Sequence, residues 1–271
     1  MKNLRPTLID QRLTIGWLYP DLMSTYGDRG NIITLKKRCE WRGIKVEILP
    51  IDHTTNDSQL TTIDLLFGGG SQDREQDIVM KSLRGKKQEA LIKLVENNIP
   101  ALFVCGAPQL MGKFYEPARG LRIDGVGIFD MVSINPGPDS PRCIGNIAAE
   151  VQWDNLHSTH NAEFITQDSI IIGFENHGGR TYLGKNAKPF AKVIKGYGNN
   201  GNDQTEGVVY KNAVGCYLHG PLLPKNPQIA DFFIKRALEV KYQKEFTLTP
   251  LDDSLEKKAR DVIVKRLGIA V

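Results

Sequence analysis

The sequence predicts an α/β protein whose mostly parallel sheet is flanked by helices. Short apolar runs alternate with segments of helical periodicity through the first half of the chain, and this order builds parallel strands joined by crossover helices. The runs at 63–67 and 101–104 end directly in Gly68-Gly69-Gly70 and in Cys105. Because functional groups of such sheets collect at the carboxyl ends of the strands, we expect a site at these two junctions.

The first half divides into short elements with recognisable ends. Ile32, Leu35 and Cys39 share one face of a helix, and Gly43 stops it. The apolar runs are short enough to be buried strands rather than helices. We expect strands at 13–18, 45–49, 63–67 and 101–104, and helices at 31–42, 85–97 and 108–114.

The second half is richer in strands and ends in two helices. A stripe of apolar side chains predicts the first helix, and Ser254 is a plausible N-cap of the second. We expect strands at 147–151, 169–174, 191–194, 208–210 and 214–218, and helices at 226–242 and 254–267. The segment 246–253 looks like a hinge, so we expect a main domain at 1–245 and a C-terminal helical appendage at 246–271.

Composition excludes several classes of protein. Lys and Arg number 35 against 31 Asp and Glu, and no basic run suggests nucleic-acid binding. No apolar run reaches the roughly 18 residues of a membrane span. Residues 1–11 lack the apolar stretch of a secretory signal, so we expect a cytoplasmic protein. The four cysteines form no CxxC pair and match no zinc spacing, and we expect neither disulfides nor a metal.

Cys105 is placed as the nucleophile of a strand–turn–helix elbow. It follows a buried strand, and its small neighbours Gly106 and Ala107 allow a tight turn. A thiol nucleophile needs a base, and His219 and His177 both end predicted strands. The other histidines, His53, His157 and His160, lie in polar loops and are expected to be solvated.

Each of these features also has a purely structural interpretation. A cysteine after a strand is more often a packing residue than a nucleophile. A histidine at a strand end is more often a hydrogen-bonded structural residue. The triplet Gly68-Gly69-Gly70 is only a weak turn signal, and Asp28-Arg29-Gly30-Asn31 could simply cap the first helix. The functional interpretation rests on these elements occurring together and in order.

Longer motifs carry a family resemblance over nearly the whole chain. The specific ones are YGDRGN at 26–31, GFENHGGRT at 173–181 and YLHGPLLPKN at 217–226, supported by FGGGSQDREQ at 67–76 and VCGAPQLMG at 104–112. In these motifs the chain resembles class I glutamine amidotransferases of the cobyric acid synthase-like type. Within that type it is most similar to the amidotransferase subunits of lipid II isoglutaminyl synthase. A single class I amidotransferase-like domain is the fold that this resemblance implies.

The resemblance implies roles for individual residues. Cys105 matches the nucleophile that attacks the glutamine side-chain amide and forms a γ-glutamyl thioester, and His219 matches the base. Backbone N–H groups near Gly69 and Gly106 would form the oxyanion hole. Arg142 falls where the family has an arginine that holds the glutamine carboxylate.

Gln109 matches a glutamine that shapes the substrate pocket. The chain departs from the family at the elbow, which usually reads C-G-G-Y-Q and here reads Cys105-Gly106-Ala107-Pro108-Gln109. Alanine is unfavourable at position 107 if the backbone there needs a positive φ, and Pro108 has no N–H to offer an oxyanion. We therefore expect slow activity, or activity that depends on a partner.

The orienting acid of the histidine is also missing from its common place. Many class I amidotransferases carry an acid two residues after the histidine, and here that residue is Pro221. Either another carboxylate takes the role or the site works as a dyad. Glu175 is the candidate for a supporting acid because GFENH ends a strand near the site. We expect His177 to be structural.

The resemblance further implies a partner. The sequence has no G-x-x-x-x-G-K-[ST] motif, so no P-loop binds ATP. The implied partner is a Mur ligase-like (MurT-like) subunit, which would use ATP and Mg²⁺, receive the ammonia and amidate D-glutamate of lipid II. The C-terminal helix could contact this partner or dock on its own body. The alternative functions are a corrinoid-pathway amidotransferase and a non-catalytic subunit that activates a partner.

Overall fold

A six-stranded sheet forms the centre of the protein, seen in a computed structural model that describes residues 11–156 and 169–269. The strand order is β13-β14-β4-β3-β1-β2, and only β13 runs antiparallel to its neighbour. The strands are β1 (Arg12–Leu18), β2 (Lys45–Ile51), β3 (Leu65–Gly68), β4 (Ala101–Val104), β13 (Val208–Tyr210) and β14 (Ala213–Cys216). The class predicted from the sequence, a mostly parallel sheet flanked by helices, is confirmed.

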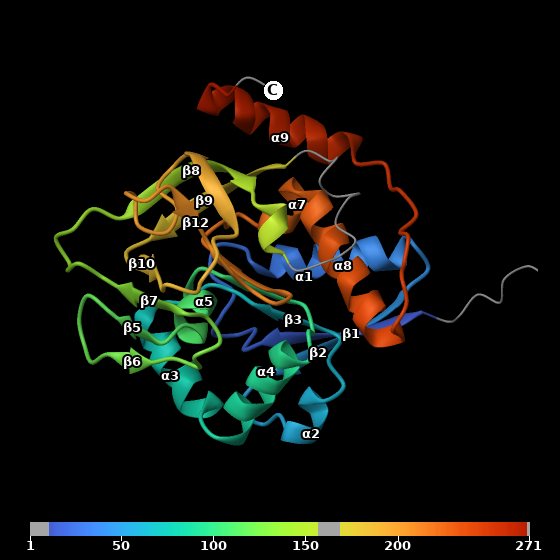
Figure 1. Cartoon of the computed structure of the whole chain (residues 1–271), viewed down its shortest axis with the longest axis horizontal. Helices are drawn as coiled ribbons and strands as arrows, with labels where there is room; N and C mark the ends of the chain where they lie inside the picture. The colour runs from blue at the N-terminus through green and yellow to red at the C-terminus, as the bar shows by residue number, and fades with distance from the viewer. Residues whose placement is uncertain (1–10, 157–168, 270–271) are drawn as a thin grey trace, which may run out of the picture.

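Helices cover the two faces of this sheet, as Figure 1 shows. Alternate strand side chains point to opposite faces. Phe67 and Val104 pack in one apolar cluster with α1 (Arg29–Glu40) and α8 (Pro227–Tyr242). Leu66 pairs with Ala101 and packs in the second cluster, which contains the apolar side chains of the helices on the other face. Those helices are α2 (Asp57–Leu60), α3 (Asp73–Leu83), α4 (Lys86–Glu96) and α5 (Gly106–Met111).

The second half of the chain adds two four-stranded sheets beside the central one. One has the order β10-β7-β5-β6 and the other β12-β11-β8-β9. Their strands are β5 (Phe114–Glu116), β6 (Ile123–Asp124), β7 (Met131–Ile134), β8 (Cys143–Val151), β9 (Ile170–His177), β10 (Arg180–Leu183), β11 (Ala191–Lys195) and β12 (Thr205–Glu206). A bridge from Phe174 to His219 joins β9 to the residues that follow β14, with N···O distances of 3.1 and 2.8 Å.

The C-terminal helix α9 (Ser254–Leu267) lies across β8 and β9 (Figure 1). Val264 and Leu267 pack on Ala148 and Ile172 in a small apolar cluster. The buried guanidinium of Arg38 in α1 pairs with Asp253, just before α9. The helix therefore docks on its own body. Among the described helices, including the short α7 (Leu222–Lys225), none is long and apolar enough to cross a membrane.

Most predicted elements occur within a few residues of their expected ends, and several short ones were not predicted. The short helices α2 and α7 and strands β5, β6, β7, β10 and β12 have no counterpart in the sequence-based prediction, and neither does the longer helix α3, of 11 residues. Strands of two to four residues are too short for a periodic signal. The histidines at 157 and 160, and residues 1–10, lie outside the described residues.

Because the central strands are parallel, their carboxyl ends meet at one edge of the sheet. Leu18 pairs with Gly68, Gly68 with Phe103, and Val104 with Cys216. The loops that follow these strands therefore converge at this edge, and they carry the motifs that the sequence singles out.

Candidate active site

Cys105 occupies a strained turn between β4 and α5. Its backbone angles are φ 56° and ψ −99°, outside the regions that a residue other than glycine normally adopts. Its N–H bonds the carbonyl of Cys216 at 2.8 Å, which fixes the turn to the end of β14. Such strain persists only where the surroundings impose it, and it is common at functional sites. The predicted strand-to-helix elbow is therefore present.

The substitutions at 107 and 108 fit this turn without strain. The positive φ falls on Cys105, and Ala107 has none, so the expected difficulty with alanine at this position does not arise. Ala107 is fully buried and its methyl group packs on Gly68. Pro108 packs on Gly215 of β14 from within the first turn of α5, where a helix does not need its N–H.

His219 lies beside Cys105 and is held by a carboxylate that we did not predict. Its Nδ1 is 3.1 Å from Oδ1 of Asp28, and both side chains are fully buried. The second oxygen of Asp28 accepts the N–H of Gly70 at 2.6 Å. A Cβ added to Gly70 would lie 2.8 Å from Cε1 of His219 and 3.4 Å from Cβ of Cys105, so both side chains approach this glycine closely. Cys105, His219 and Asp28 thus lie together, as a thiol, an imidazole and a carboxylate in one cluster.

The motifs at 26–31 and 217–226 pack against each other, and this contact positions Asp28. A Cβ at Gly30 would lie only 2.4 Å from Cγ of Pro221, so glycine is needed for the two loops to approach. The side-chain oxygen of Asn31 accepts the N–H of Leu223 at 2.9 Å. Asp28 is the N-cap residue of α1 but makes no side-chain cap hydrogen bond, which contradicts the simple capping interpretation. The sequence does hold a signal for this acid, because Asp28 stands within the specific motif YGDRGN at 26–31, but the prediction did not use it.

The charge on His219 is stabilised from two sides. Burial lowers its pKa, but the Cys105 thiolate and the Asp28 carboxylate outweigh that effect and raise the pKa well above its usual value. Its Nε2 is buried and bonds no oxygen or nitrogen among the described residues. Tyr26 packs edge-on against the ring, with the centroids 5.1 Å apart. The surroundings therefore favour the imidazolium form of His219.

Glu175, the acid considered at the sequence level, is engaged elsewhere. Its two oxygens accept the N–H groups of Tyr197 at 2.7 Å and Gly198 at 2.9 Å. It lies 4.0 Å from Nε2 of His177, and burial raises its pKa to about 7. The supporting acid of His219 in the structure is therefore Asp28, because the Glu175 carboxylate is used to hold the loop after β11.

His177 has a structural environment, as expected. Its Nδ1 bonds the carbonyl of Gly179 at 2.8 Å, and its ring stacks on Tyr217 with centroids 3.9 Å apart. Burial lowers its pKa to about 3, so the ring is neutral. Glu206, which sequence reasoning missed, accepts the N–H of Tyr217 at 2.6 Å and so fixes the segment that leads to His219.

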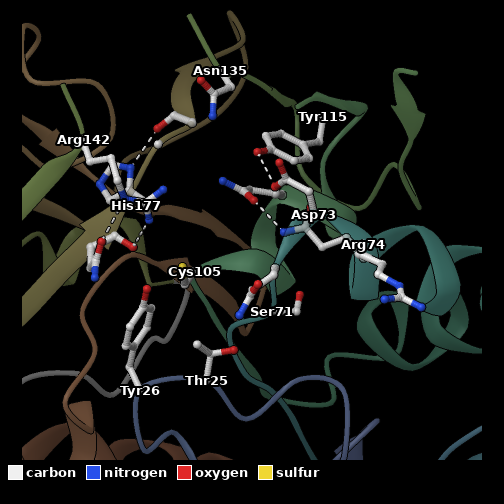
Figure 2. Close-up of a pocket in the computed structure, with 16 residues that line it drawn as sticks. Thr25, Tyr26, Ser71, Asp73, Arg74, Cys105, Tyr115, Asn135, Arg142 and His177 are labelled. Carbon is white, nitrogen blue, oxygen red and sulfur yellow. Dashed lines mark hydrogen bonds between the residues drawn. The ribbon is translucent and has the colours of Figure 1, made fainter. Parts of the chain in front are cut away.

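Cys105 opens into a cavity of about 480 Å³, shown in Figure 2. Arg142 lies on its wall, where Nε and Nη2 donate to the side chain and carbonyl of Asn176, each at 3.1 Å. Asp73 lines the same cavity and accepts the hydroxyl of Tyr115 at 2.9 Å. Gln109 also lines it, between Gln76 at 2.8 Å and Tyr217 at 3.1 Å. The cavity therefore combines a thiol with groups of both charges.

The predicted oxyanion residues lie on the two sides of the elbow. Gly106 opens α5, where the first N–H groups have no partner within the helix. Gly69 packs against the carbonyl of Met23 and the side chain of Asp28. The residue of this loop that faces Gly106 is Ser71, whose N and Oγ would lie 2.8 and 2.6 Å from a Cβ at position 106.

Comparisons with known proteins identify the family of the chain. Residues 14–227 match the CobB/CobQ-like glutamine amidotransferase domain. The GatD subunit of lipid II isoglutaminyl synthase (glutamine-hydrolyzing) from Streptococcus pneumoniae is 38% identical over 91% of this chain and 88% of its own. The corresponding Staphylococcus aureus subunit is 37% identical over 94% of this chain and 96% of its own.

A solved structure is similar in fold. The glutaminase domain of Trypanosoma brucei CTPS with bound acivicin superposes with a TM-score of 0.55 at 12% identity, covering 88% of this chain and 96% of that one. The family match spans most of the chain and contains the elbow, the histidine and the buried acid. This chain belongs to the family of CobB/CobQ-like glutamine amidotransferase domains.

Proposed function

We propose that this chain is the glutaminase subunit of a lipid II isoglutaminyl synthase, which releases ammonia from L-glutamine for a ligase partner. The observation that carries the proposal is the constellation of Cys105, His219 and Asp28 at the end of a cavity that opens to the surface. Two relatives that align with about nine-tenths of this chain are named as GatD subunits of lipid II isoglutaminyl synthase.

The first chemical step forms a thioester. The Cys105 thiolate attacks the γ-carbonyl carbon of glutamine, a C–S bond forms and the carbonyl electron pair moves to oxygen. When the tetrahedral intermediate collapses, the C–N bond breaks and the leaving nitrogen takes the proton from Nε2 of His219. Ammonia departs, and the γ-glutamyl thioester remains on Cys105.

The second step hydrolyses the thioester. Nε2 of His219 takes a proton from water, whose oxygen attacks the thioester carbon, and the C–S bond breaks to regenerate the thiolate and release glutamate. Asp28 keeps its bond to Nδ1 through both steps. It fixes the orientation of the ring and stabilises the imidazolium form.

The cavity fits a small zwitterion. Arg142 offers a guanidinium for the α-carboxylate, and Asp73 offers a carboxylate for the α-ammonium group. In Figure 2 these two side chains lie on different walls, with Cys105 between them. Gln109, held on both sides by hydrogen bonds, helps to shape the pocket for the side-chain amide.

The partner follows from the chemistry of the acceptor. Amidation of a carboxylate needs its activation, and we expect ATP and Mg²⁺ on a Mur ligase-like (MurT-like) subunit that receives the ammonia and amidates D-glutamate of lipid II. We expect no cofactor in this subunit. A cytoplasmic location suits both the ATP of the partner and a free thiol at the site.

The two alternative functions have less support. A corrinoid-pathway enzyme fits less well because the GatD subunits match this chain over nearly their whole length. A non-catalytic role was suggested by the altered elbow, but Ala107 has no positive φ and leaves the turn intact. Glutamine hydrolysis is therefore the function that the site supports best.

The test is ammonia release from glutamine by the purified chain, alone and with a co-expressed Mur ligase-like subunit. We expect release that disappears in Cys105→Ala and that the partner accelerates. Absence of any Cys105-dependent release under both conditions would contradict the proposal. Amidated lipid II, measured by mass spectrometry with the partner present, checks the acceptor separately.

A further inference from the structure

Three buried polar atoms in side chains that line the cavity have no hydrogen-bond partner among the described residues. They are Oγ of Ser71, Oε1 of Gln76 and Nε2 of His177. A native protein rarely leaves such atoms unpaired, so each is a candidate contact for a bound molecule. Of the three atoms, Oγ of Ser71 lies against the elbow, 2.6 Å from a Cβ at Gly106. Gln76 also approaches this point, at 2.8 Å, but with its Nε2, which already donates to Gln109.

In the loop that carries Ser71, one backbone N–H group is already hydrogen-bonded and cannot bind a reacting oxygen. The N–H of Gly70 is bonded to Asp28 at 2.6 Å and is not available. Across the elbow, Pro108 has no N–H, so Gly106 and Ala107 carry the amides of the first turn. The backbone nitrogen and the hydroxyl oxygen of Ser71 both lie close to Gly106, the residue next to Cys105.

We propose that the hydroxyl of Ser71 donates a hydrogen bond to the oxyanion of the tetrahedral intermediates, together with the N–H groups of Ser71 and Gly106. The inference rests on the proposed glutaminase function and adds a side-chain donor to its oxyanion hole. Figure 2 shows Ser71 next to Cys105, on the side of the cavity away from Arg142. This position serves the reacting carbon rather than the α-carboxylate.

A donor that acts on the oxyanion stabilises the transition state and not the bound substrate. Removal of one such donor lowers kcat by about 10²- to 10³-fold in a known case. For Ser71→Ala we therefore expect kcat to fall by roughly 10²-fold while KM changes less than about twofold. Ser71→Thr keeps the hydroxyl and should retain most of the activity.

The matched control is Ser82→Ala, which removes a serine hydroxyl in α3 that bonds Tyr19 at 2.8 Å, outside the cavity. We expect its kinetics to equal those of the wild type. Thermal melting of all variants separates loss of folding from loss of chemistry, and Ser71→Ala should melt with the wild type.

A second readout does not depend on ammonia release. Glutamate γ-semialdehyde should add to Cys105, where the C–S bond forms, the carbonyl π bond breaks and its oxygen takes the oxyanion position. Calorimetry should show this aldehyde binding roughly 10²-fold more weakly to Ser71→Ala, and glutamine binding equally well to Cys105→Ala and to the Cys105→Ala/Ser71→Ala double variant.

Three outcomes would overturn the inference. They are unchanged kcat in Ser71→Ala, a raised KM at constant kcat, and unchanged affinity for the aldehyde. A raised KM would instead place the hydroxyl on the bound substrate. Failure of the proposed function gives a different pattern, because then the wild type itself releases no ammonia, with or without the partner.

Discussion

Among the described residues, two histidines each lie near a buried carboxylate, and the pKa values of the two histidines shift in opposite directions. His219 contacts Asp28 at 3.1 Å, and its pKa is raised well above its usual value. His177 lies 4.0 Å from Glu175, and its pKa is lowered to about 3. Direct contact with a carboxylate and a thiolate offsets the cost of burying the imidazolium, whereas mere proximity does not.

The carboxylates differ in how their oxygens are used. Oδ1 of Asp28 contacts Nδ1 of His219, and Oδ2 of Asp28 accepts a hydrogen bond from the N–H of Gly70. Both oxygens of Glu175 accept hydrogen bonds from backbone N–H groups, and burial raises the pKa of Glu175 to about 7. We therefore expect the His219–Asp28 pair to take part in proton transfer, whereas the Glu175 carboxylate holds a loop in place.

The largest contrast is expected between the two histidines. His219→Asn removes the proton donor and acceptor, so kcat for glutamine hydrolysis should fall by about ten-thousand-fold. His177→Asn removes the stacking on Tyr217 and should mainly reduce thermal stability, by about 1–2 kcal/mol. Steady-state kinetics and thermal melting of both variants check this, and an equal loss of kcat in the two would contradict it.

The two carboxylates should separate in the same way. Asp28→Asn should lower kcat by roughly 10²- to 10⁴-fold, because the ring loses its orientation and its charge partner. Since the carboxylate raises the pKa of His219, the basic limb of the pH–rate profile should move to lower pH. Glu175→Gln should change kcat less than about threefold. A larger effect of Glu175→Gln than of Asp28→Asn would reverse the comparison.

A stability effect is expected at Glu206. Burial raises its pKa from 4.5 to about 8, so the folded state binds the proton more tightly than the unfolded chain. The resulting stabilisation is complete below pH 4.5 and is lost as the pH rises toward 8. One pKa unit corresponds to about 1.4 kcal/mol, so the loss is on the order of a few kcal/mol.

Glu206→Gln does not titrate and should therefore be free of this loss. Urea unfolding between pH 5 and pH 8 should show the variant gaining stability relative to the wild type as the pH rises through that range. A constant difference between the two proteins would show that Glu206 does not change its proton binding on folding.

The smallest expected effect is at Arg142, which lies at the surface end of the cavity. Arg142→Ala removes a charge-assisted contact to the α-carboxylate, so KM for glutamine should rise by about 10- to 100-fold at nearly constant kcat. Alkylation of Cys105 by iodoacetamide, which has no α-carboxylate, should be unaffected. A loss confined to kcat would place Arg142 in another role.

The positions of most elements along the chain, and the place of Cys105 directly after a strand, were predictable from local patterns. Residues 101–104 and 254–267 have the boundaries that the sequence predicts, because a short apolar run and a periodic stripe are strong signals. Cys105 follows from its place after a buried strand. The family motifs supplied His219, Arg142 and Gln109.

The pairing of Asp28 with His219 was not predictable in this way. The two residues are 191 positions apart, and their contact depends on the close packing of Gly30 against Pro221. Hydrophobic periodicity reports local structure only, so it does not indicate a contact between residues so far apart in the sequence. Glu175 was the candidate acid because its strand ends near the site. The direction of a strand does not show whether a carboxylate at its end is already hydrogen-bonded to other groups.

In the proposed mechanism, Cys105, His219 and Asp28 act as one unit on a glutamine side chain. The most direct measurement is the rate at which the glutamine analogue diazo-oxo-norleucine labels Cys105, followed by mass spectrometry in the wild type, Asp28→Asn and Glu175→Gln. We predict a single adduct on Cys105, slowed by roughly 10²-fold or more in Asp28→Asn and nearly unchanged in Glu175→Gln. Equal rates in all three proteins, or an adduct on another cysteine, would contradict the account.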